Sequence, residues 1–288
     1  MTLLAIIAAL FGERFIGSVQ EFRQFQWLAD AGEWIRRQSS GLDSWIGAIL
    51  ILLLAGTIVE LAYLWLSKGF IILGFVAATA VLLFCIGPRS FYDQIKSFCD
   101  AYSNGNEDSA YWYLSNLKDS ALTDEDERYL AKAALEAAFV AVNNRLLGVI
   151  FWFVILGPFG AVIYRISGDF HRLEEEGDQR SQLYAAFDRI HYLLNWPSSR
   201  LVSISYAAMG SFVEGMSHLK RSASPTSNWP DPNEQLLVSS GLGALDLKQE
   251  QATEIGCDQI FSGLALLRRS VAFWVGVIAL LTLAGWLG

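Results

Sequence analysis

Long uncharged apolar runs constrain the fold of this chain more than any other feature of its sequence. Residues 45–66 carry one charge in 22 residues, and residues 70–87 carry none. At a rise of about 1.5 Å per residue, helices of this length cross a hydrocarbon core of about 30 Å. Two more apolar runs, 146–166 and 270–288, are also long enough to cross. The runs predict an all-α, polytopic helical membrane protein with four to five transmembrane helices plus amphipathic or re-entrant helices.

The composition agrees with a chain that lies largely in lipid. Hydrophobic residues make up 53% of the sequence and charged residues only 17%, with 10 Trp and 18 Phe. A bilayer accommodates many aromatic side chains at lipid-facing and interfacial positions, whereas one soluble core of this size does not. The net charge of −8 argues against binding nucleic acid through a basic face. The expected partner is therefore the lipid bilayer and not a nucleic acid.

Shorter segments complete the predicted membrane domain. Only three residues separate the first two runs, so these runs are expected to form a tight antiparallel hairpin. Residues 1–12 are too short to span alone and are expected to pack at membrane depth, whereas residues 201–213 suit a buried or re-entrant helix as well as a tilted span. The regions 88–145 and 167–269 are expected to be helical loops. The prediction is a single membrane domain over residues 1–288.

The predicted orientation depends on the 201–213 region. If that region does not cross, six Lys and Arg lie near the span ends on each side, and the positive-inside rule orients nothing. If it crosses, the division becomes ten to four, and the 88–145 loop is cytoplasmic. Cys99 and Cys257 then lie on the same side of the membrane.

Two helices outside the spans are predicted from local patterns. Thr123 is the expected N-cap of a helix that leads into the third span. Between residues 178 and 195, apolar side chains at helical spacing form one amphipathic face, and Trp196-Pro197 is expected to end that helix. The face consists of Leu183, Phe187, Ile190 and Leu194.

Polar residues in and beside the spans are the first candidates for function. Glu60 lies within the first run. It is either a relay or ligand group inside the bundle or a charge that extends to the membrane interface. Glu136 and Asn143 share one face of a helix that enters the third run, which suits an interhelical contact and a ligand site equally. The motif GPFG at 157–160 is expected to kink that run and to let another backbone approach closely.

Few residues suit a metal or a catalytic centre. An acidic stretch after the third run either binds a divalent cation or faces water and complements a helix dipole. It contains Asp169, His171, Glu174, Glu175, Glu176 and Asp178. The three cysteines lack metal-binding spacing and are expected to be unpaired thiols. Nucleotide-binding, serine-hydrolase and zincin motifs are also missing, so we expect no metal and no cofactor and assign no catalytic residue.

Three stretches of the sequence resemble a known membrane family. They are ALEAAFVAVNNRLLGVIFWFVILGPFGAVIYRISGD (134–169), LYAAFDRIHYLLNWPSSRL (183–201) and SPTSNWPDPNEQLLVSSGLGAL (224–245). Their order is similar to that of the family containing AmpE and the cobalamin-pathway enzyme CobD/CbiB. The resemblance covers about 110 residues of the chain.

The sequence departs from the enzyme branch of that family in several motifs. An NTLDS element is reduced to ISGD at 166–169, and the paired aspartates of an LDD element become Asp188-Arg189. Asp231 stands where the enzymes have a glutamate. These departures favour the branch of the family outside the cobalamin pathway. An ERF start at 13–15 and a final uncharged span are similar to AmpE.

The AmpE resemblance implies a regulatory or sensor protein of the bacterial inner membrane, associated with β-lactamase induction and peptidoglycan stress signalling. Its implied ligand is a muropeptide or another cell-wall compound. Association of the chain with copies of itself into a homo-oligomer is left open. Two other functions stay open. One is a CobD/CbiB-like adenosylcobinamide-phosphate synthase, which forms an amide. The other is a small-molecule or lipid transporter, which the Gly/Pro-interrupted spans suggest.

The candidate ligand site joins polar residues at the ends of apolar segments, where a charge needs a partner or water. We expect these residues to converge on one pocket at the membrane surface. They are Glu136, Asn143, Arg165, Asp169, Asp188, Arg200, Asn228, Trp229, Pro230 and Asp231. A structural explanation also stays open, in which two of the arginines neutralise Asp169 and Asp188.

Overall fold

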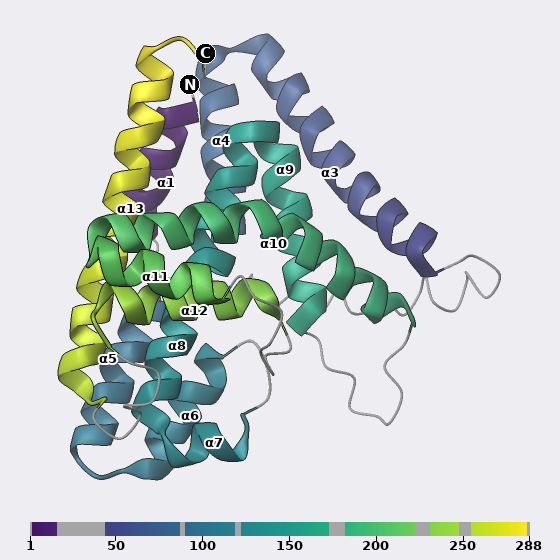
Figure 1. The fold of residues 1–288 in the computed structure, drawn as a ribbon. Coiled ribbons are helices and arrows are strands. Elements are labelled where there is room, and N and C mark those ends of the chain that lie inside the picture. Colours follow the sequence, from purple (N-terminus) through teal and green to yellow (C-terminus); the bar gives the residue numbers. More distant parts are fainter. Residues whose placement is uncertain are drawn as a thin grey trace. The chain divides into compact units, whose positions relative to one another are not determined.

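Helices account for every regular element in the part of the chain that the structure describes, which confirms the all-α prediction (Figure 1). The computed structural model describes residues 2–15, 44–86, 90–118, 122–172, 182–222, 231–247 and 255–286. Three helices are long and apolar enough to cross a membrane, at Trp45–Gly69, Leu130–Phe170 and Cys257–Leu283. Shorter apolar helices cover Thr2–Gly12 and Ile72–Cys85. The chain is a multi-pass helical membrane protein.

The helices divide into two compact units, each built from separated stretches of the chain. The first unit contains Met1–Pro88, Gly148–Asn195 and Leu281–Gly288, and the second contains Arg89–Leu147 and Trp196–Leu280. Two long helices, α10 (Gln182–Met209) and α13 (Cys257–Leu283), contribute residues to both units.

The first two predicted spans form the hairpin that the sequence predicts. Helix α3 (Ser44–Gly69) is followed after one residue by α4 (Ile71–Cys85), with Phe70 in an extended conformation between them. The turn is tight, because a Cβ placed on Gly74 would lie 2.9 Å from the Ser67 Cβ atom.

The surface of this hairpin exposes large apolar side chains, as membrane helices do. Leu54 and Leu61 on α3 are each 66% exposed, and Trp65 near its end is 77% exposed. Such a face is favourable against lipid, where the backbone polar groups are already satisfied within the helix. Helix α1 (Thr2–Phe15) packs on the apolar helix α4, with Gly12 beside Leu83. Its expected position at membrane depth stays a prediction.

Helix α9 (Gly148–Arg172) breaks at the GPFG motif, which confirms the predicted kink. Gly157 has a φ of 65° and a ψ of −152°, a conformation that is open to glycine and strained for other residues. Pro158 has no amide hydrogen to continue the preceding ladder, but its fixed φ suits the first turn of a new helix. The two halves of α9 are therefore separate helical segments.

The two halves fold back on each other, whereas the sequence predicts one kinked span over 146–166. A Cβ placed on Gly160 would overlap the carbonyl oxygen of Trp152, and one placed on Gly148 would overlap the Tyr164 hydroxyl group. In a straight helix, residues sixteen positions apart would be separated by about 24 Å. Both ends of α9 thus lie on the same side of its turn. The motif indicated a kink, but its angle depends on the backbone conformation that glycine adopts.

The second half of α9 begins against Glu60 of α3. The Glu60 carboxylate atom Oε2 accepts a hydrogen bond from Phe159 N at 3.3 Å. Phe159 lies in the first turn of its half-helix, where backbone N–H groups have no partner within the helix. One turn before Glu60, a Cβ on Gly56 would lie 2.7 Å from the Phe159 ring. Glu60 therefore faces the helix bundle and caps the broken helix, and its proposed role as a relay stays untested.

Helix α10 runs through Pro197, so the prediction that Trp196-Pro197 ends this helix is wrong. Proline removes a backbone donor and displaces carbonyl groups of the preceding turn. One carbonyl of that turn, Leu194 O, accepts a hydrogen bond from Trp152 Nε1 at 3.0 Å. This long-range hydrogen bond joins α9 to the turn of α10 that precedes the proline, and local sequence patterns do not reveal it.

The second unit packs helices around a buried apolar core. It contains α5 (Ser90–Ser103), α6 (Glu107–Leu117), α8 (Leu130–Val142), α11 (Phe212–Ser222), α12 (Pro232–Ala244) and parts of α10 and α13. The alanine-rich helix α8 allows close approach: Gly241 lies against the Phe139 ring, and the Tyr206 hydroxyl donates to Phe139 O at 2.9 Å.

Thr123 is the N-cap that the sequence predicts. Asp126 N donates to Thr123 Oγ1 at 3.3 Å, and Thr123 N donates to Asp126 Oδ2 at 2.8 Å. This reciprocal pair is a capping box, with aspartate in the place of the usual glutamate. The capped helix α7 (Asp124–Arg128) is short, and Tyr129 separates it from α8.

The 201–213 region is not one continuous helix. Helix α10 ends at Met209, and α11 folds back on it, because a Cβ on Gly215 would lie 2.9 Å from the Ala207 Cβ atom. The region is therefore not one straight span, and its place relative to the membrane stays a prediction.

Candidate functional site

Polar side chains gather in two clusters, one in each compact unit. The α9–α10 cluster consists of Tyr164, Arg165, Ser167, Asp169, His191 and Asn195 in the first unit. The α10–α12 cluster consists of Trp196, Ser199, Arg200, Asp231 and Asn233 in the second unit. Every member of the α9–α10 cluster is at most 9% exposed. The α10–α12 cluster is partly open.

An ion pair lies in the α9–α10 cluster. Arg165 Nε donates to Asp169 Oδ2 at 3.0 Å, one helical turn apart, and each side chain is 10% exposed. A buried charge needs such a partner, because removing it from water is otherwise expensive. This pair confirms half of the structural explanation, in which the arginines neutralise nearby aspartates.

The rest of the α9–α10 cluster is a pair of hydrogen bonds between the second half of α9 and α10. The Tyr164 hydroxyl donates to Asn195 Oδ1 at 3.2 Å, and Ser167 Oγ lies 3.1 Å from His191 Nδ1. Gly168 lets the His191 ring approach, since a Cβ there would be 3.1 Å from His191 Cε1. Each hydrogen bond satisfies groups that would be costly to bury unpaired.

Sequence analysis missed His191 and Asn195. They directly follow Ile190 and Leu194, two members of the predicted apolar face of α10. The available signal was their i, i+4 spacing, which places both at one edge of that face. The buried side of α10 is wider than its apolar stripe and includes both residues.

Arg200 is the centre of the α10–α12 cluster. Its atom Nη1 donates to Trp196 O at 3.0 Å and to Asn233 Oδ1 at 3.1 Å. The guanidinium carbon lies 4.1 Å from the centroid of the Trp196 ring, a close cation–π arrangement. Arg200 is half-buried and Trp196 is 49% exposed, so the arginine is fixed in direction yet reaches the surface of its unit.

Asn233 connects α12 to this arginine and was not among the predicted residues. It is fully buried, and its Oδ1 atom also accepts from Ser199 Oγ at 3.4 Å. Asp231 accepts a hydrogen bond from Asn233 N at 2.7 Å and is the N-cap of α12. The predicted residue Asp231 thus positions the first turn of α12, and that turn carries Asn233. Asn228, Trp229 and Pro230 lie outside the described residues.

Glu136 and Asn143 lie in the second unit, on α8 and at the start of a π-helical turn at Asn143–Leu147. Lys132 Nζ lies 3.8 Å from Glu136 Oε1, and Asn143 Nδ2 donates to Asn144 Oδ1 at 3.1 Å. Both contacts are local to their helix. A role in ligand binding therefore stays a prediction for these two residues.

The predicted single pocket draws on both units. Arg165, Asp169 and the half-buried Asp188 belong to the first unit, whereas Glu136 and Arg200 belong to the second. The structure brings Arg165 to Asp169, and it brings Arg200 to the helix that Asp231 caps. Convergence of both groups on one site, including the predicted contact of Arg200 with Asp188, stays a prediction.

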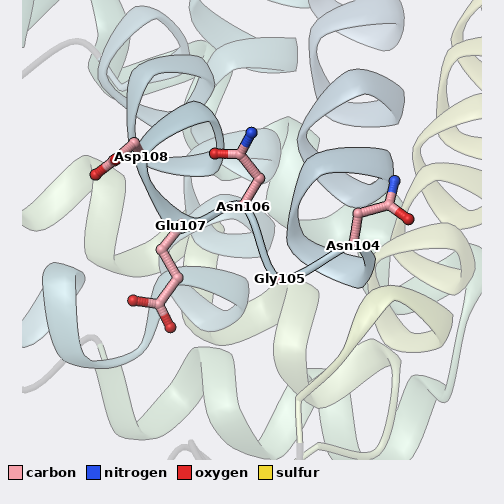
Figure 2. Close-up of a pocket in the computed structure, with 5 residues that line it drawn as sticks. All are labelled: Asn104, Gly105, Asn106, Glu107 and Asp108. Atoms are coloured by element: carbon pink, nitrogen blue, oxygen red, sulfur yellow. The ribbon is translucent and has the colours of Figure 1, made fainter.

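A surface hollow lies between α5 and α6 and is lined by Asn104, Gly105, Asn106, Glu107 and Asp108 (Figure 2). The labelled side chains point outward in different directions and do not converge on a common centre. Asn106 Oδ1 accepts from Ser109 N at 3.1 Å and caps α6, while Asn104 Nδ2 donates to Asp100 O at 2.7 Å. The polar residues of this turn therefore end one helix and start the next.

Among the described residues, three or more His, Cys, Asp or Glu side chains nowhere come together in a way that could hold a metal ion. Most of the acidic stretch considered above, including Glu174, Glu175, Glu176 and Asp178, lies outside the described residues.

Comparison with known proteins places these clusters in a family. The family model described as CobD/Cbib protein matches residues 6–253, which include both clusters. The chain belongs to the CobD/Cbib family. This confirms the coarser part of the resemblance, whereas a specific assignment to AmpE is not shown.

Three curated relatives are named for cobalamin biosynthesis. The cobalamin biosynthesis protein CobD of Stutzerimonas stutzeri is 26% identical over 209 residues, covering 72% of this chain and 65% of the relative. CobD of Chromobacterium violaceum is 26% identical over 185 residues, covering 63% and 57%. The probable CobD of Pyrococcus furiosus is 24% identical over 178 residues, covering 61% and 60%. The alignments thus span less than two thirds of each relative. No solved structure matches the chain.

Proposed function

We propose that this chain works in cobalamin biosynthesis at the bacterial inner membrane, where it binds a corrinoid carboxylic acid and promotes amide formation on it. The names of the three relatives support this proposal over the regulatory alternative. The structural observation that carries it is Arg200, a half-buried arginine held in one direction by Trp196 and Asn233.

The chemistry of amide formation suits a fixed arginine at the edge of a membrane protein. A nucleoside triphosphate first transfers a phosphoryl group to the carboxylate. The amine nitrogen then bonds to the carboxyl carbon, the C–O bond to the phosphate breaks with its electrons left on the phosphate, and the amine proton passes to the departing phosphate. Both the carboxylate and the phosphate are anions that a planar guanidinium recognises well. The contacts of Arg200 with Trp196 and Asn233 reduce the conformational entropy that binding would otherwise remove.

The α9–α10 cluster is expected to support this site without touching the ligand. Its ion pair and hydrogen bonds are buried, and they join the second half of α9 to α10. A buried polar network of this kind rigidifies the helices that carry it. We therefore assign ligand recognition to Arg200 and scaffolding to Arg165 and Asp169.

Binding of cobyric acid to the purified full-length protein in detergent tests the proposal. Cobyric acid should raise the melting temperature of the wild-type protein, because a ligand that binds the folded state stabilises it. Arg200→Ala should abolish the rise. Lys220→Ala is a matched control, since Lys220 is an exposed cation on α11 of the same unit. It should keep the rise.

Growth of a cobalamin-dependent strain that lacks its own synthase of this family supplies the functional test. Expression of this chain should restore growth without added cobalamin, and the Arg200→Ala variant should not. Absence of cobyric acid binding together with absence of growth would contradict the cobalamin proposal.

An AmpE-type regulator is the second candidate, and the motif departures favour it. Asp188 is followed by Arg189 where the enzymes have paired aspartates, and Asp231 acts as a helix cap. One carboxylate fewer beside Asp188, and an Asp231 carboxylate that caps a helix, suit recognition of a ligand better than chemistry on it. On this alternative, an anhydro-muropeptide and not cobyric acid would raise the melting temperature, and deletion of the gene would alter β-lactamase induction.

We further propose that nearly all positive charge of the chain lies on the cytoplasmic side. If α9 returns to the side it enters from and the 201–213 region does not cross, Lys68 is the one cation on the opposite side. The remaining 20 of the 21 Lys and Arg residues (21 − 1) then share one side, which the positive-inside rule makes cytoplasmic. This replaces the ten-to-four division. In sealed inverted vesicles, a cysteine in place of Lys68 should resist an impermeant maleimide until detergent is added.

A further inference from the structure

Two of the three cysteines lie together where α13 begins beside α5, in the second unit. Cys257 is the first residue of α13, and its Sγ atom donates a weak hydrogen bond to Cys99 O at 3.6 Å. The Ser103 hydroxyl, one turn further along α5, lies 3.5 Å from the same sulfur atom. Both contacts place the Cys257 side chain against the last two turns of α5, which carry Cys99. The Cys257 sulfur therefore packs directly against Cys99, although the two residues are 158 positions apart in the sequence.

The two thiols differ in their access to solvent. Cys99 is 2% exposed, whereas Cys257 is half-buried at the end of its helix. Burial raises the pKa of the Cys99 thiol above its ordinary value, and the neighbouring Cys257 raises it further. Cys99 therefore stays protonated and shielded. A small oxidant therefore reaches Cys257 before it reaches Cys99, and Cys99 lies next to Cys257.

We propose that Cys99 and Cys257 are a redox modification site, at which a hydroperoxide joins the two thiols in a disulfide bond. In the first step the Cys257 sulfur attacks one peroxide oxygen, the O–O bond breaks, and Cys257 becomes a sulfenic acid while water leaves. In the second step the Cys99 sulfur attacks the Cys257 sulfur while the Cys99 thiol proton passes to the leaving hydroxyl group, so that the S–O bond breaks and a second water is released. The two thiols lose two electrons and two protons, and the peroxide gains them.

The disulfide would link the start of a membrane helix to a helix of the extramembrane region. Helix α13 is one of the three helices long enough to span, and α5 lies in the region after the α3–α4 hairpin. Oxidation would therefore fix the end of the span to α5 and reduction would release it. This inference does not depend on which ligand the α10–α12 cluster binds.

Thiol counting after exposure of the folded, detergent-purified protein to hydrogen peroxide tests the inference. The protein is unfolded afterwards and labelled with a maleimide-linked polymer. The reduced chain should carry three labels and the oxidised chain one, since the sequence has three cysteines. Peptide mass spectrometry should find one linked pair containing residues 99 and 257, which dithiothreitol should separate.

Serine variants supply the controls. Cys85→Ser should still lose two thiols, because Cys85 lies on α4 in the first unit. Cys99→Ser and Cys257→Ser should each prevent the linked pair. Since Cys257 is half-buried, its variant should keep the wild-type melting temperature and remain interpretable even if Cys99→Ser does not fold. A linked pair that contains Cys85, a linkage between two chains, or retention of all three thiols would overturn the proposal.

Discussion

The two polar clusters share arginine, aspartate, asparagine and serine residues but differ in how far they are exposed to solvent. In the α9–α10 cluster, Arg165 and Asp169 bond each other at 3.0 Å and are each 9% exposed. In the α10–α12 cluster, Arg200 is half-buried and packs on a Trp196 ring that is 49% exposed. The comparison teaches that a charged residue at a family motif position identifies no function by itself. Its burial and its partners decide between a structural and a binding role.

The largest effect is expected from breaking the ion pair of the α9–α10 cluster. Asp169→Ala leaves the Arg165 guanidinium in a buried position without the carboxylate that bonds it. Removing one partner of a buried pair destabilises proteins by about 3–5 kcal/mol. The unfolding free energy of the detergent-solubilised protein measures this loss.

The double variant Arg165→Met/Asp169→Leu is the control for this experiment. It removes both charges and keeps similar side-chain volumes, so its stability should return close to that of the wild type. If Asp169→Ala is as stable as the wild type, the pair is not structural, and the contrast between the clusters fails.

A smaller loss is expected from filling the close approach inside α9. Gly160→Ala places a methyl group against the Trp152 backbone, so the two halves of α9 must move apart. Overpacking of this kind costs about 1–3 kcal/mol. Gly276→Ala on α13 is the matched control, because no atom lies within 4 Å of a Cβ at that position. Equal melting temperatures of the two variants would show that α9 is not folded back as described.

Much of the fold follows from sequence patterns, whereas much of the polar network does not. Apolar runs and capping residues act locally, so the α3–α4 hairpin and the Thr123 cap were predictable. The reversal at Gly157 depends on one backbone conformation, which the GPFG motif permits without requiring. Pro197 lies inside α10, and a distant indole donates to Leu194 O in the preceding turn, a contact that no local pattern encodes.

The candidate site was predictable in the same uneven way. The resemblance placed Arg165, Asp169 and Arg200 at functional positions, because motif residues can be matched one by one. Asn233 and His191 were missed, since their importance comes from partners on other helices. Long-range pairing of this kind becomes visible only when the helices are packed.

The smallest of these stability effects is expected at a capping contact of the second unit, and it depends on pH. Burial raises the pKa of Asp126, but hydrogen bonds from Lys118 and Thr123 outweigh it, so that the pKa lies below the ordinary value of 3.8. A carboxyl group with a lowered pKa stabilises the fold above its unfolded pKa, and this stability is lost as the pH falls through the folded value. Asp126→Asn should cost about 1 kcal/mol at neutral pH.

The dependence of stability on pH below neutrality checks that the charge of Asp126 stabilises the fold. The difference in stability between the wild type and Asp126→Asn should be constant near neutral pH and should shrink as the pH falls below about 4. A difference that does not change with pH would mean that the charge of Asp126 contributes nothing. In contrast to Arg200, Asp126 should show no effect on ligand binding at any pH.

One pair of variants tests the assignment of scaffolding to one cluster and binding to the other most directly. The measurement is the melting temperature of Arg200→Ala and Asp169→Asn, each without ligand, with cobyric acid and with an anhydro-muropeptide. Arg200→Ala should melt near the wild type and lose the rise produced by whichever ligand stabilises the wild type. Asp169→Asn should melt lower and keep that rise. If Arg200→Ala keeps the rise and Asp169→Asn loses it, the α9–α10 cluster binds the ligand and the account is wrong.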